Sequence, residues 1–394
     1  MIDFVEVRDK TTREVIGIID TAQSIIWKSS YYSVGSFEIY TSASKIALEC
    51  LVEGNYVTRL DNDECGIIES VEITDSADEG RMIIASGRFV KSLLDRRVVY
   101  YPTLKGTGLD YVWSCSPSVL EGNVEGAVRK LIYDNAIDAY QVRQDSSGSP
   151  IKIPYSARNM SEIHWTDEDV TGISDVISSF NEQGTAETDA EKQVTYKNLQ
   201  EYTDSVLQEY ECGAKMWLDT TLLKFRYKVY RGEDRSRDST THEPVIFSKE
   251  FDNLLSSTYK VDVSTYKTTA LIGGEGEGTD RKCALAYDWI SGIDRRETFV
   301  DASGTAQEGI GIQDYRKQLE SQGQQSIKEL GKIEAFDGEL DVTNSNLTYG
   351  KDYNLGDIVT IEDKTINKYI NARILTVTEV EDGDGYKIDI EYGV

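Results

Sequence analysis

Residues 24–40 read SIIWKSSYYSVGSFEIY, a stretch that is rich in Ile, Tyr, Phe and Trp. Side chains of this kind, β-branched or aromatic, are enriched in β-strands. In the second half of the stretch apolar and polar residues alternate, which places Phe37 and Ile39 on one face of an extended segment. The stretch therefore predicts β-structure near the start of the chain.

The segments on both sides of this stretch have the same character. Two short apolar runs, 5–9 and 14–20, are separated by KTTR and predict a hairpin. A second hairpin is predicted across the turn DNDE at 61–64, and RMIIASGRFV at 81–90 continues the meander. We therefore expect the chain to about residue 100 to be antiparallel and to form a barrel or a curled sheet.

The pattern changes between about residues 105 and 240, where helical spacing enters. Apolar spacing predicts helices at 123–137 and 198–213, the second ending at Gly213, and a shorter helix at 175–183. A hairpin that turns at Asp219–Thr220 follows. One face of the second helix would carry Leu199, Tyr202, Val206, Leu207 and Tyr210. This middle part is therefore predicted to be α+β.

Strand patterns return in the last third of the chain. PVIFSKEF at 244–251 and the long run at 254–274 predict strands, and a helix is predicted at 311–330. The tail from Lys332 to Val394 is again β-rich. The whole chain is therefore predicted to be mainly β with an α+β part.

A glycine-rich loop in LIGGEGEGTDRK at 271–282 raises the question of nucleotide binding. The dinucleotide fingerprint fails because Thr279 stands where its third glycine belongs. The Walker A pattern fails because Thr279 and Asp280 replace its Lys and Ser/Thr, and Glu275 and Glu277 would repel a phosphate. We therefore predict a turn or bulge between two strands.

Composition limits the possible classes of protein. The 394 residues are enough for two to four domains, and the formal net charge of −27 disfavours an exposed surface for nucleic acid or anionic membranes. No apolar run reaches the roughly 20 residues of a membrane helix, and the start MIDFVEVRDK lacks the features of a signal peptide. The five scattered cysteines fit reduced thiols in a cytosolic setting, and we expect no metal site.

Residues suited to catalysis are few. His164 and His242 have no partner motif, and no G-x-S-x-G marks a nucleophile, so we expect no catalytic residue. Asp382 and Asp384 have the spacing of calcium ligands, but Tyr386 takes the third ligand position, so a β-turn is expected there.

Two groups of charges remain open to interpretation. Acidic stretches at 166–172 and 59–64 could supply the two carboxylates of a glycoside hydrolase, although charges at turns are usually solvated. Positive charge gathers in GRFVKSLLDRRVV, and a salt-bridged subunit contact is favoured there over weak nucleic-acid binding. The cations of this cluster are Arg88, Lys91, Arg96 and Arg97.

Several segments together resemble siphovirus-type tail proteins of Gram-positive phages and prophages. They follow one another in the order of that family and span nearly the whole chain: WKSSYYSVGSFEIY, GRFVKSLLDRRVV, KFRYKVYRGEDRS, ALIGGEGEGTDRK, YNLGDIVTIEDK and ARILTVTEVEDGDGYKIDIEYG. The family is similar to the baseplate hub proteins of tailed phages and of contractile phage-tail-like particles. The resemblance transfers no catalytic residue and no cofactor.

The resemblance implies a structural role in a virion or phage-tail-like particle that is assembled in the bacterial cytoplasm. Hubs of this kind are homotrimers in which each subunit carries two tube-like antiparallel β-barrels, so that six barrels match the hexameric tail tube. The implied domains are a first barrel at 1–104, an α+β insertion at 105–240, a second barrel at 241–334 and a C-terminal β module at 335–394. Strands from distant segments can complete one barrel.

The implied partners are two further copies, a tail tube or distal tail protein, and a spike, fibre or tape-measure protein. DNA would be present only in transit, and no stable membrane association is expected. A ring of three chains would carry a net charge of about −81. We predict an acidic channel wall, with Arg96 and Arg97 at a subunit contact or outside the lumen. The alternatives are a tail-associated cell-wall hydrolase and a carbohydrate-binding receptor protein.

Overall fold

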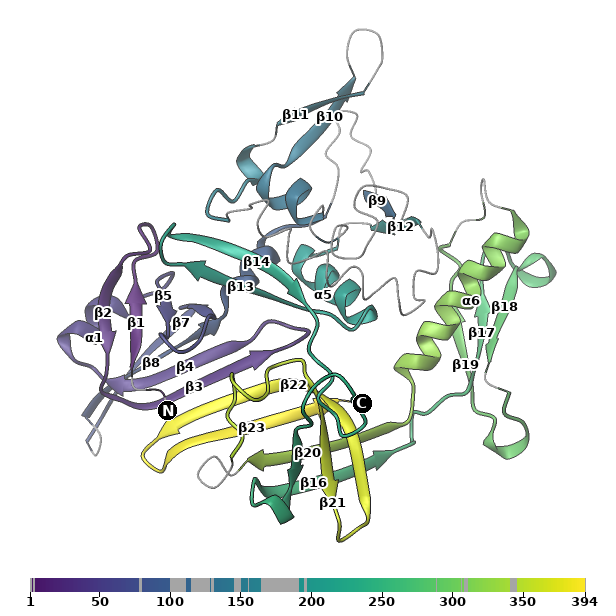
Figure 1. Ribbon diagram of the computed structural model, residues 1–394. Coiled ribbons are helices and arrows are strands. Elements are labelled where there is room, and N and C mark those ends of the chain that lie inside the picture. Colours follow the sequence, from purple (N-terminus) through teal and green to yellow (C-terminus); the bar gives the residue numbers. More distant parts are fainter. Residues whose placement is uncertain are drawn as a thin grey trace. The chain divides into compact units, whose positions relative to one another are not determined.

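The structure is a computed structural model (Figure 1). It describes residues 2, 4–77, 80–99, 111–114, 128, 131–144, 150–154, 156–163, 191–194, 197–287, 289–305, 307, 311–340 and 346–393. The chain divides into two compact units, which we describe separately. The first unit contains Met1–Ser256 and Gly338–Tyr392, and the second contains Ser257–Asp337 with Gly393–Val394.

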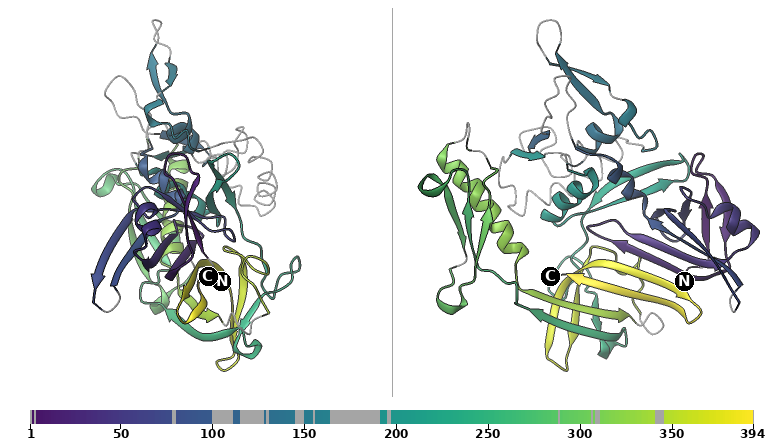
Figure 2. Two further views of the ribbon diagram at one scale, coloured as in Figure 1. Left: turned by 90° about the vertical axis from the view of Figure 1, so that its left-hand side faces the viewer. Right: turned by 180° about the vertical axis from the view of Figure 1, so that it is seen from behind.

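The main sheet of the first unit joins segments from both ends of the sequence. Its ten strands follow the path β7-β8-β4-β3-β22-β23-β20-β16, with β21 beside β22 and β15 beside β21; β20 is Ile333–Leu340 and β16 is Leu254–Asp262. Strand β3 (purple) and strand β22 (yellow) lie side by side in Figures 1 and 2. They pair in antiparallel register, with Trp27 opposite Glu379. The strands are β3 Ala22–Ser30, β4 Ser36–Ser42, β7 Ser70–Ser76, β8 Gly80–Arg88, β15 Ile246–Ser248, β21 Ile358–Asp363, β22 Lys368–Asp382 and β23 Gly385–Gly393.

A smaller sheet and a short helix complete the first core. The smaller sheet has the order β2-β1-β5-β6, formed by Val15–Ile19, Val5–Arg8, Tyr56–Thr58 and Cys65–Ile67. Helix α1 (Lys45–Cys50) is capped by Ser44, whose hydroxyl accepts a hydrogen bond from the Ala47 amide at 3.1 Å. Trp27, Phe37 and Phe89 are buried in the core that these elements share. The alternation of Phe37 and Ile39 predicted from the sequence is confirmed, because both side chains are buried.

The middle of the chain forms a second core in the same unit. Helix α5 (Leu199–Glu209) packs against hairpin β13–β14 (Gly213–Asp219 and Lys224–Tyr230) and the 3₁₀ segment η1 (Val90–Arg96). The predicted face of α5 and the predicted hairpin are confirmed. The predicted stop is wrong: the helix ends before Glu211, which adopts φ 59°, and Gly213 instead begins β13.

Short elements surround this second core. They are β9 Tyr111–Ser114, β10 Tyr140–Gln144, β11 Pro150–Pro154, β12 Glu191–Val194, the π-helical turn Tyr133–Ile137 and the 3₁₀ turn Ser156–Arg158. Another 3₁₀ turn, Lys249–Phe251, directly follows β15 of the main sheet. Of the helix predicted at 123–137, the structure describes residues 128 and 131–137. These residues are helical, the last five in the π-helical turn, and Leu131 and Ile132 are buried as expected, so the prediction is confirmed for this part. The helix predicted at 175–183 lies entirely outside the described residues.

The second unit is a three-stranded sheet with one helix on its face, seen most clearly in the right-hand view of Figure 2. Its strand order is β18-β17-β19, and helix α6 (Ile312–Glu329) covers a core of Ile272, Ala286, Tyr315 and Leu319. The predicted helix at 311–330 is therefore confirmed. The strands are β17 Thr269–Gly273, β18 Cys283–Tyr287 and β19 Glu297–Asp301, and neighbouring strands β16 Leu254–Asp262 and β20 Ile333–Leu340 lead into and out of this unit. Two further 3₁₀ turns are Gly278–Asp280 and Gly292–Asp294.

The fold is mainly β with α+β parts, as the sequence predicts. Within the described residues none of the sheets closes into a barrel, so two tube-like barrels are not confirmed in the single chain. The sheets are also not purely antiparallel, because β17 pairs with β19, and β15 with β21, in parallel. The domain boundaries at 104, 240 and 334 stay a prediction. No helix in the described part of the chain is long and apolar enough to cross a membrane.

Candidate functional site

A cleft of about 850 Å³ lies in the first unit, beside the loop at 59–64, hairpin β13–β14, the loop at 347–357 and hairpin β22–β23. Carboxylates and tyrosines dominate its wall, and a few cations accompany them. The carboxylates are Asp61, Asp63, Glu64, Glu233, Asp357 and Glu379, the tyrosines are Tyr230, Tyr349, Tyr353 and Tyr386, and the cations are Lys215, Lys228 and Arg231. The acidic stretch at 59–64 noted in the sequence is thus not simply solvated, because it forms part of this wall.

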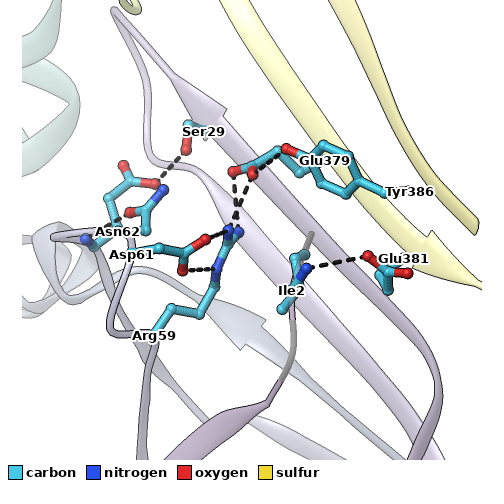
Figure 3. Close-up of polar contacts among 9 residues, drawn as sticks. Ile2, Ser29, Arg59, Asp61, Asn62, Glu379, Glu381 and Tyr386 are labelled. Atoms are coloured by element: carbon cyan, nitrogen blue, oxygen red, sulfur yellow. Dashed lines mark hydrogen bonds and ion pairs between the residues drawn. The ribbon is translucent and has the colours of Figure 1, made fainter. Parts of the chain in front are cut away.

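Beside the cleft, Arg59 joins two carboxylates from distant parts of the chain (Figure 3). Its Nη1 and Nη2 each donate to one oxygen of Glu379 at 3.0 Å, and Nε and Nη2 donate to Asp61 at 2.9 and 2.7 Å. The Tyr386 hydroxyl donates to Glu379 at 2.7 Å. The Arg59 guanidinium also lies over the Trp27 ring at 5.4 Å. We call Arg59, Asp61, Glu379 and Tyr386 the arginine clamp.

The local sequence explains how the clamp forms. Arg59 directly follows β5, and the chain then turns so that Asp61 reaches back to the same guanidinium. Glu379 faces inward from β22 opposite Trp27, and Tyr386 comes from β23 after the two-residue turn at 383–384. The turn predicted from EDGDG is therefore confirmed.

Arg59 and Asp61 of the clamp stay ionised in the folded chain. Burial alone would lower the pKa of Arg59, but the hydrogen bonds and charges of Asp61 and Glu379 prevail and raise it, so the guanidinium stays protonated. Partial burial acts to raise the pKa of Asp61, but the hydrogen bonds and charge of Arg59 lower it overall. The clamp is therefore an ionic link between the segments at 59–61 and 379–386.

Glu64 is the carboxyl group with the most altered acidity in the cleft. Burial raises the pKa of Glu64 to about 7, while the hydrogen bond from Ser29 and the charge of Lys91 act in the opposite direction. Glu379 adds to the rise through like-charge repulsion. Near neutral pH the Glu64 carboxyl group is therefore protonated in a large fraction of molecules.

The arrangement suits structural support better than glycoside hydrolysis. A hydrolase needs a second carboxylate free to act as nucleophile or base beside the protonated acid. Both oxygens of Glu379 are bound by Arg59, Asp61 is bound by Arg59, and Asp63 pairs with Lys215 at 2.9 Å. Glu233 pairs with Arg235 at 2.6 Å, and Asp357 accepts hydrogen bonds from the amides of Glu233 and Asn354, both at 2.8 Å. The prediction that the chain has no catalytic centre stays a prediction. Within the described residues no cluster of His, Cys, Asp and Glu could hold a metal ion.

The remaining candidates from the sequence lie apart from the cleft or at its margin. The glycine-rich loop links antiparallel strands β17 and β18, with Gly276 at φ 97° and Gly278 at φ 57°, which confirms the predicted inter-strand turn. His242 lies 3.4 Å from Glu233 at a partly exposed position. His164 and the stretch at 166–172 lie outside the described residues. Among the described residues, Cys50, Cys65, Cys212 and Cys283 form no disulfide.

Two cations of the predicted basic cluster, Arg88 and Lys91, form ion pairs within the chain. Arg88 binds Glu69 at 2.9 Å and Asp95 at 3.2 Å. Lys91 is buried against Asp204 at 3.2 Å. Arg97 donates to the carbonyl oxygen of Arg158 at 2.8 Å, and Arg96 is exposed. The first two cations therefore stabilise the fold rather than form an open basic surface.

A second gathering of positive charge was missed in the sequence. The outward face of hairpin β13–β14 carries Lys215, Lys224, Arg226 and Lys228. Lys215 and Arg226 lie over the Trp217 ring at 5.4 and 5.8 Å. The sequence KFRYKVY at 224–230 could have predicted this basic face, because its apolar and basic residues alternate. In a strand, side chains two positions apart point to the same side, so Lys224, Arg226 and Lys228 share one face.

Two solved structures of tail proteins share the fold of the chain. The 43 kDa tail protein of prophage MuSo2 from Shewanella oneidensis has a similar fold, with TM-score 0.56, 12% identity, and 99% and 98% of the two chains covered. A tail protein from Neisseria meningitidis MC58 gives TM-score 0.52 and 12% identity, with 99% and 96% covered. Prophage tail protein gp18 from Listeria monocytogenes EGD-e gives TM-score 0.47 and 11% identity, with 99% and 94% covered.

No curated protein shows a significant match to the chain. The sequence matches the family described as Siphovirus ReqiPepy6 Gp37-like protein over residues 4–394, which is nearly its whole length. Because this match spans the sheets of both units, the chain belongs to the Siphovirus ReqiPepy6 Gp37-like family of phage tail proteins.

Proposed function

We propose that the chain is a baseplate hub, or tail-tip, protein that forms a trimeric ring and adapts the hexameric tail tube to a three-fold spike or tip. The family match over residues 4–394 carries this proposal. The fold shared with two tail proteins, one of them from a prophage, over nearly their full lengths supports it. The protein then acts as a structural component of a tail rather than as an enzyme.

The open sheets of the single chain fit such an assembly. Edge strands with unpaired backbone groups need closure or partners, because they otherwise invite aggregation. Strand β7 ends the main sheet, and β18 and β19 are the two edges of the small sheet. In our proposal neighbouring subunits cover these edges and complete the two tube-like barrels. The ring also contacts a tail tube or distal tail protein on one side, and a spike, fibre or tape-measure protein on the other.

The charge of the chain supports a role around DNA in transit. A ring with an acidic channel wall would let DNA slide, since basic groups would bind its backbone and release counterions. The surface potential of an assembled ring tests this point. A neutral or positive wall, or Arg96 and Arg97 in the lumen, would contradict it.

The mass of the purified protein in solution is the main test. Light scattering should give a particle near three times 44.2 kDa. A stable monomer at micromolar concentration would contradict the trimeric hub. Cleavage of purified cell wall in a zymogram, abolished by one carboxylate-to-amide substitution, would favour the hydrolase alternative, and strong hits on a glycan array would favour the receptor-binding alternative.

A further inference from the structure

Three tyrosines of the cleft in the first unit carry hydroxyl groups that are available to a ligand. Tyr230 is the last residue of β14, and Tyr349 and Tyr353 come from the loop before β21. Within the described part of the chain, none of these three hydroxyls forms a hydrogen bond, although only 1% of Tyr353 is exposed. The hydroxyl of the fourth tyrosine, Tyr386, instead donates to Glu379 (Figure 3). Polar groups inside proteins normally have partners, so three unpaired hydroxyls around one cleft indicate a binding site.

The three hydroxyls lie close to the same two carboxyl groups. Burial is the main cause that raises the pKa of Tyr230, Tyr349 and Tyr353. The charge of Glu64 adds to the rise for Tyr230 and Tyr349, and the charge of Glu379 adds to it for Tyr349 and Tyr353. Because such effects weaken with distance, the hydroxyls converge on these carboxyl groups. All three hydroxyls also stay protonated near neutral pH, so each can both donate and accept a hydrogen bond.

The charged groups around the cleft, in contrast, are mostly engaged within the chain. Five carboxylates already have partners, which are cations or backbone amides: Asp61, Asp63, Glu233, Asp357 and Glu379. Lys228 is exposed and forms no ion pair with a described residue, but it is a single cation among an excess of carboxylates. An anionic ligand would be repelled by these carboxylates, and a cationic ligand would have to compete with the cations that bind them. The wall of the cleft therefore favours an uncharged ligand.

We infer that this cleft binds a neutral saccharide. Sugar hydroxyls donate and accept hydrogen bonds as the three phenols do, and the side-chain amides of Asn62 and Asn354 line the same cleft. Tyrosine rings offer an apolar body beside a polar tip, which matches the C–H and O–H groups of a sugar ring. An apolar ligand would leave these polar groups unpaired. The volume of about 850 Å³ lies in the range of small-molecule sites. This binding function goes beyond the proposed structural role and does not depend on the trimer.

Titration of the full-length protein with uncharged sugars tests the site. The probes are maltotriose, cellotriose and tri-N-acetylchitotriose, and trigalacturonic acid is the anionic counterpart. Isothermal titration calorimetry should show that at least one neutral trisaccharide binds with a Kd of about 1 mM or lower. Trigalacturonic acid should bind at least about tenfold more weakly, because it meets the carboxylates of the wall. No heat of binding from any neutral probe at about 10 mM would overturn the inference.

Two substitutions separate the hydroxyls from the tyrosine rings. Tyr230→Phe and Tyr349→Phe each remove one hydroxyl and keep the ring, so each should weaken binding of the saccharide by about three- to tenfold. Both should leave the denaturation midpoint unchanged, since neither hydroxyl binds another described group. Tyr369→Phe is the matched control, because Tyr369 lies on β22 outside the cleft and is 51% exposed. It should change neither the affinity nor the midpoint.

The outcomes separate the saccharide site from the hub. Saccharide binding that both tyrosine variants leave unchanged would place the ligand elsewhere and overturn the inference. Tighter binding of trigalacturonic acid than of any neutral probe would overturn it as well. Weaker binding that comes with a lowered denaturation midpoint would assign the hydroxyls a structural role instead. A trimer that binds no neutral trisaccharide overturns the site but not the hub, whereas a monomer that binds one overturns the hub but not the site.

Discussion

The two units of the chain are held together in different ways. The first unit depends on pairing between residues far apart in sequence, because β3 joins β22 and Arg59 is bound to Glu379, 320 positions away. The sheet and helix of the second unit come from one continuous stretch, residues 269–329, and pack through small residues such as Gly323 and Ala286. Ionic and long-range contacts thus secure one unit, and close local packing secures the other.

This comparison predicts where single substitutions act. A change in the arginine clamp should destabilise the first unit, and a change under helix α6 should destabilise the second. Hydrogen exchange followed by mass spectrometry reports on the two units separately, because compact units can open independently.

The largest effect is expected for Glu379→Ala. The change leaves the Arg59 guanidinium, whose side chain is 1% exposed, without its buried partner. Removing one member of a buried ion pair costs about 3–5 kcal/mol of unfolding free energy. Chemical denaturation should show this loss, together with faster exchange in β3 and β22. The second unit should keep its protection.

Two comparisons sharpen this result. Asp75→Ala removes an exposed ion pair with Arg81 and should cost less than about 1 kcal/mol. Arg59→Met combined with Glu379→Leu removes both buried charges, so it should recover most of the stability lost in Glu379→Ala. A double variant no more stable than Glu379→Ala would show that the clamp acts through its shape rather than through its charges.

A pH-dependent effect is expected from Glu64. Burial raises the pKa of Glu64 from an ordinary 4.5 to about 7 in the folded chain, so folding favours its protonated form. The stability associated with this group is fully present below the unfolded pKa and is lost as pH rises through about 7. Relative to Glu64→Gln, the wild-type protein should lose roughly 2–3 kcal/mol of unfolding free energy between pH 5 and 8.

The measurement is the difference between the two denaturation curves at several pH values. Taking the difference removes the contributions of all other titrating groups that the substitution leaves unchanged. Curves that stay parallel from pH 5 to 8 would contradict the raised pKa of Glu64.

Sequence patterns predicted the local structure much better than the site. The spacing of Leu199, Val206 and Leu207 predicted α5, and the failed phosphate templates predicted the turn after Gly273. These features depend on residues that are close in sequence. The arginine clamp instead depends on residues far apart in sequence, and nothing in the sequence around Glu379 indicates that Arg59 binds it. The raised pKa of Glu64 likewise depends on its burial and on the nearby Glu379, Lys91 and Ser29, which the spacing of residues does not reveal.

An effect of intermediate size is expected for Gly323→Ala in helix α6. Alanine normally stabilises a helix relative to glycine by about 1 kcal/mol. A Cβ atom at Gly323 would meet Ala286 Cβ at 2.7 Å and would also overlap the Ile272 side chain. Overpacking should therefore reverse the sign and cost about 1–3 kcal/mol, with faster exchange confined to the second unit. Ser321→Ala, at an exposed position of the same helix, is the control and should not destabilise.

The smallest effect is expected for Tyr315→Phe. The buried Tyr315 hydroxyl donates to the Thr305 carbonyl oxygen at 2.7 Å and accepts from the Glu275 amide at 2.8 Å, so it ties the glycine-rich loop to helix α6. The loss should be about 1 kcal/mol, because Glu275 is exposed and water can replace its partner. Amide exchange in the loop at 274–280 should rise while the core of α6 stays protected. Tyr287→Phe, which alters a partly exposed tyrosine on the opposite face, should leave both quantities unchanged. Equal loop exchange in the Tyr315→Phe and wild-type proteins would show that the loop is held by its backbone turn alone.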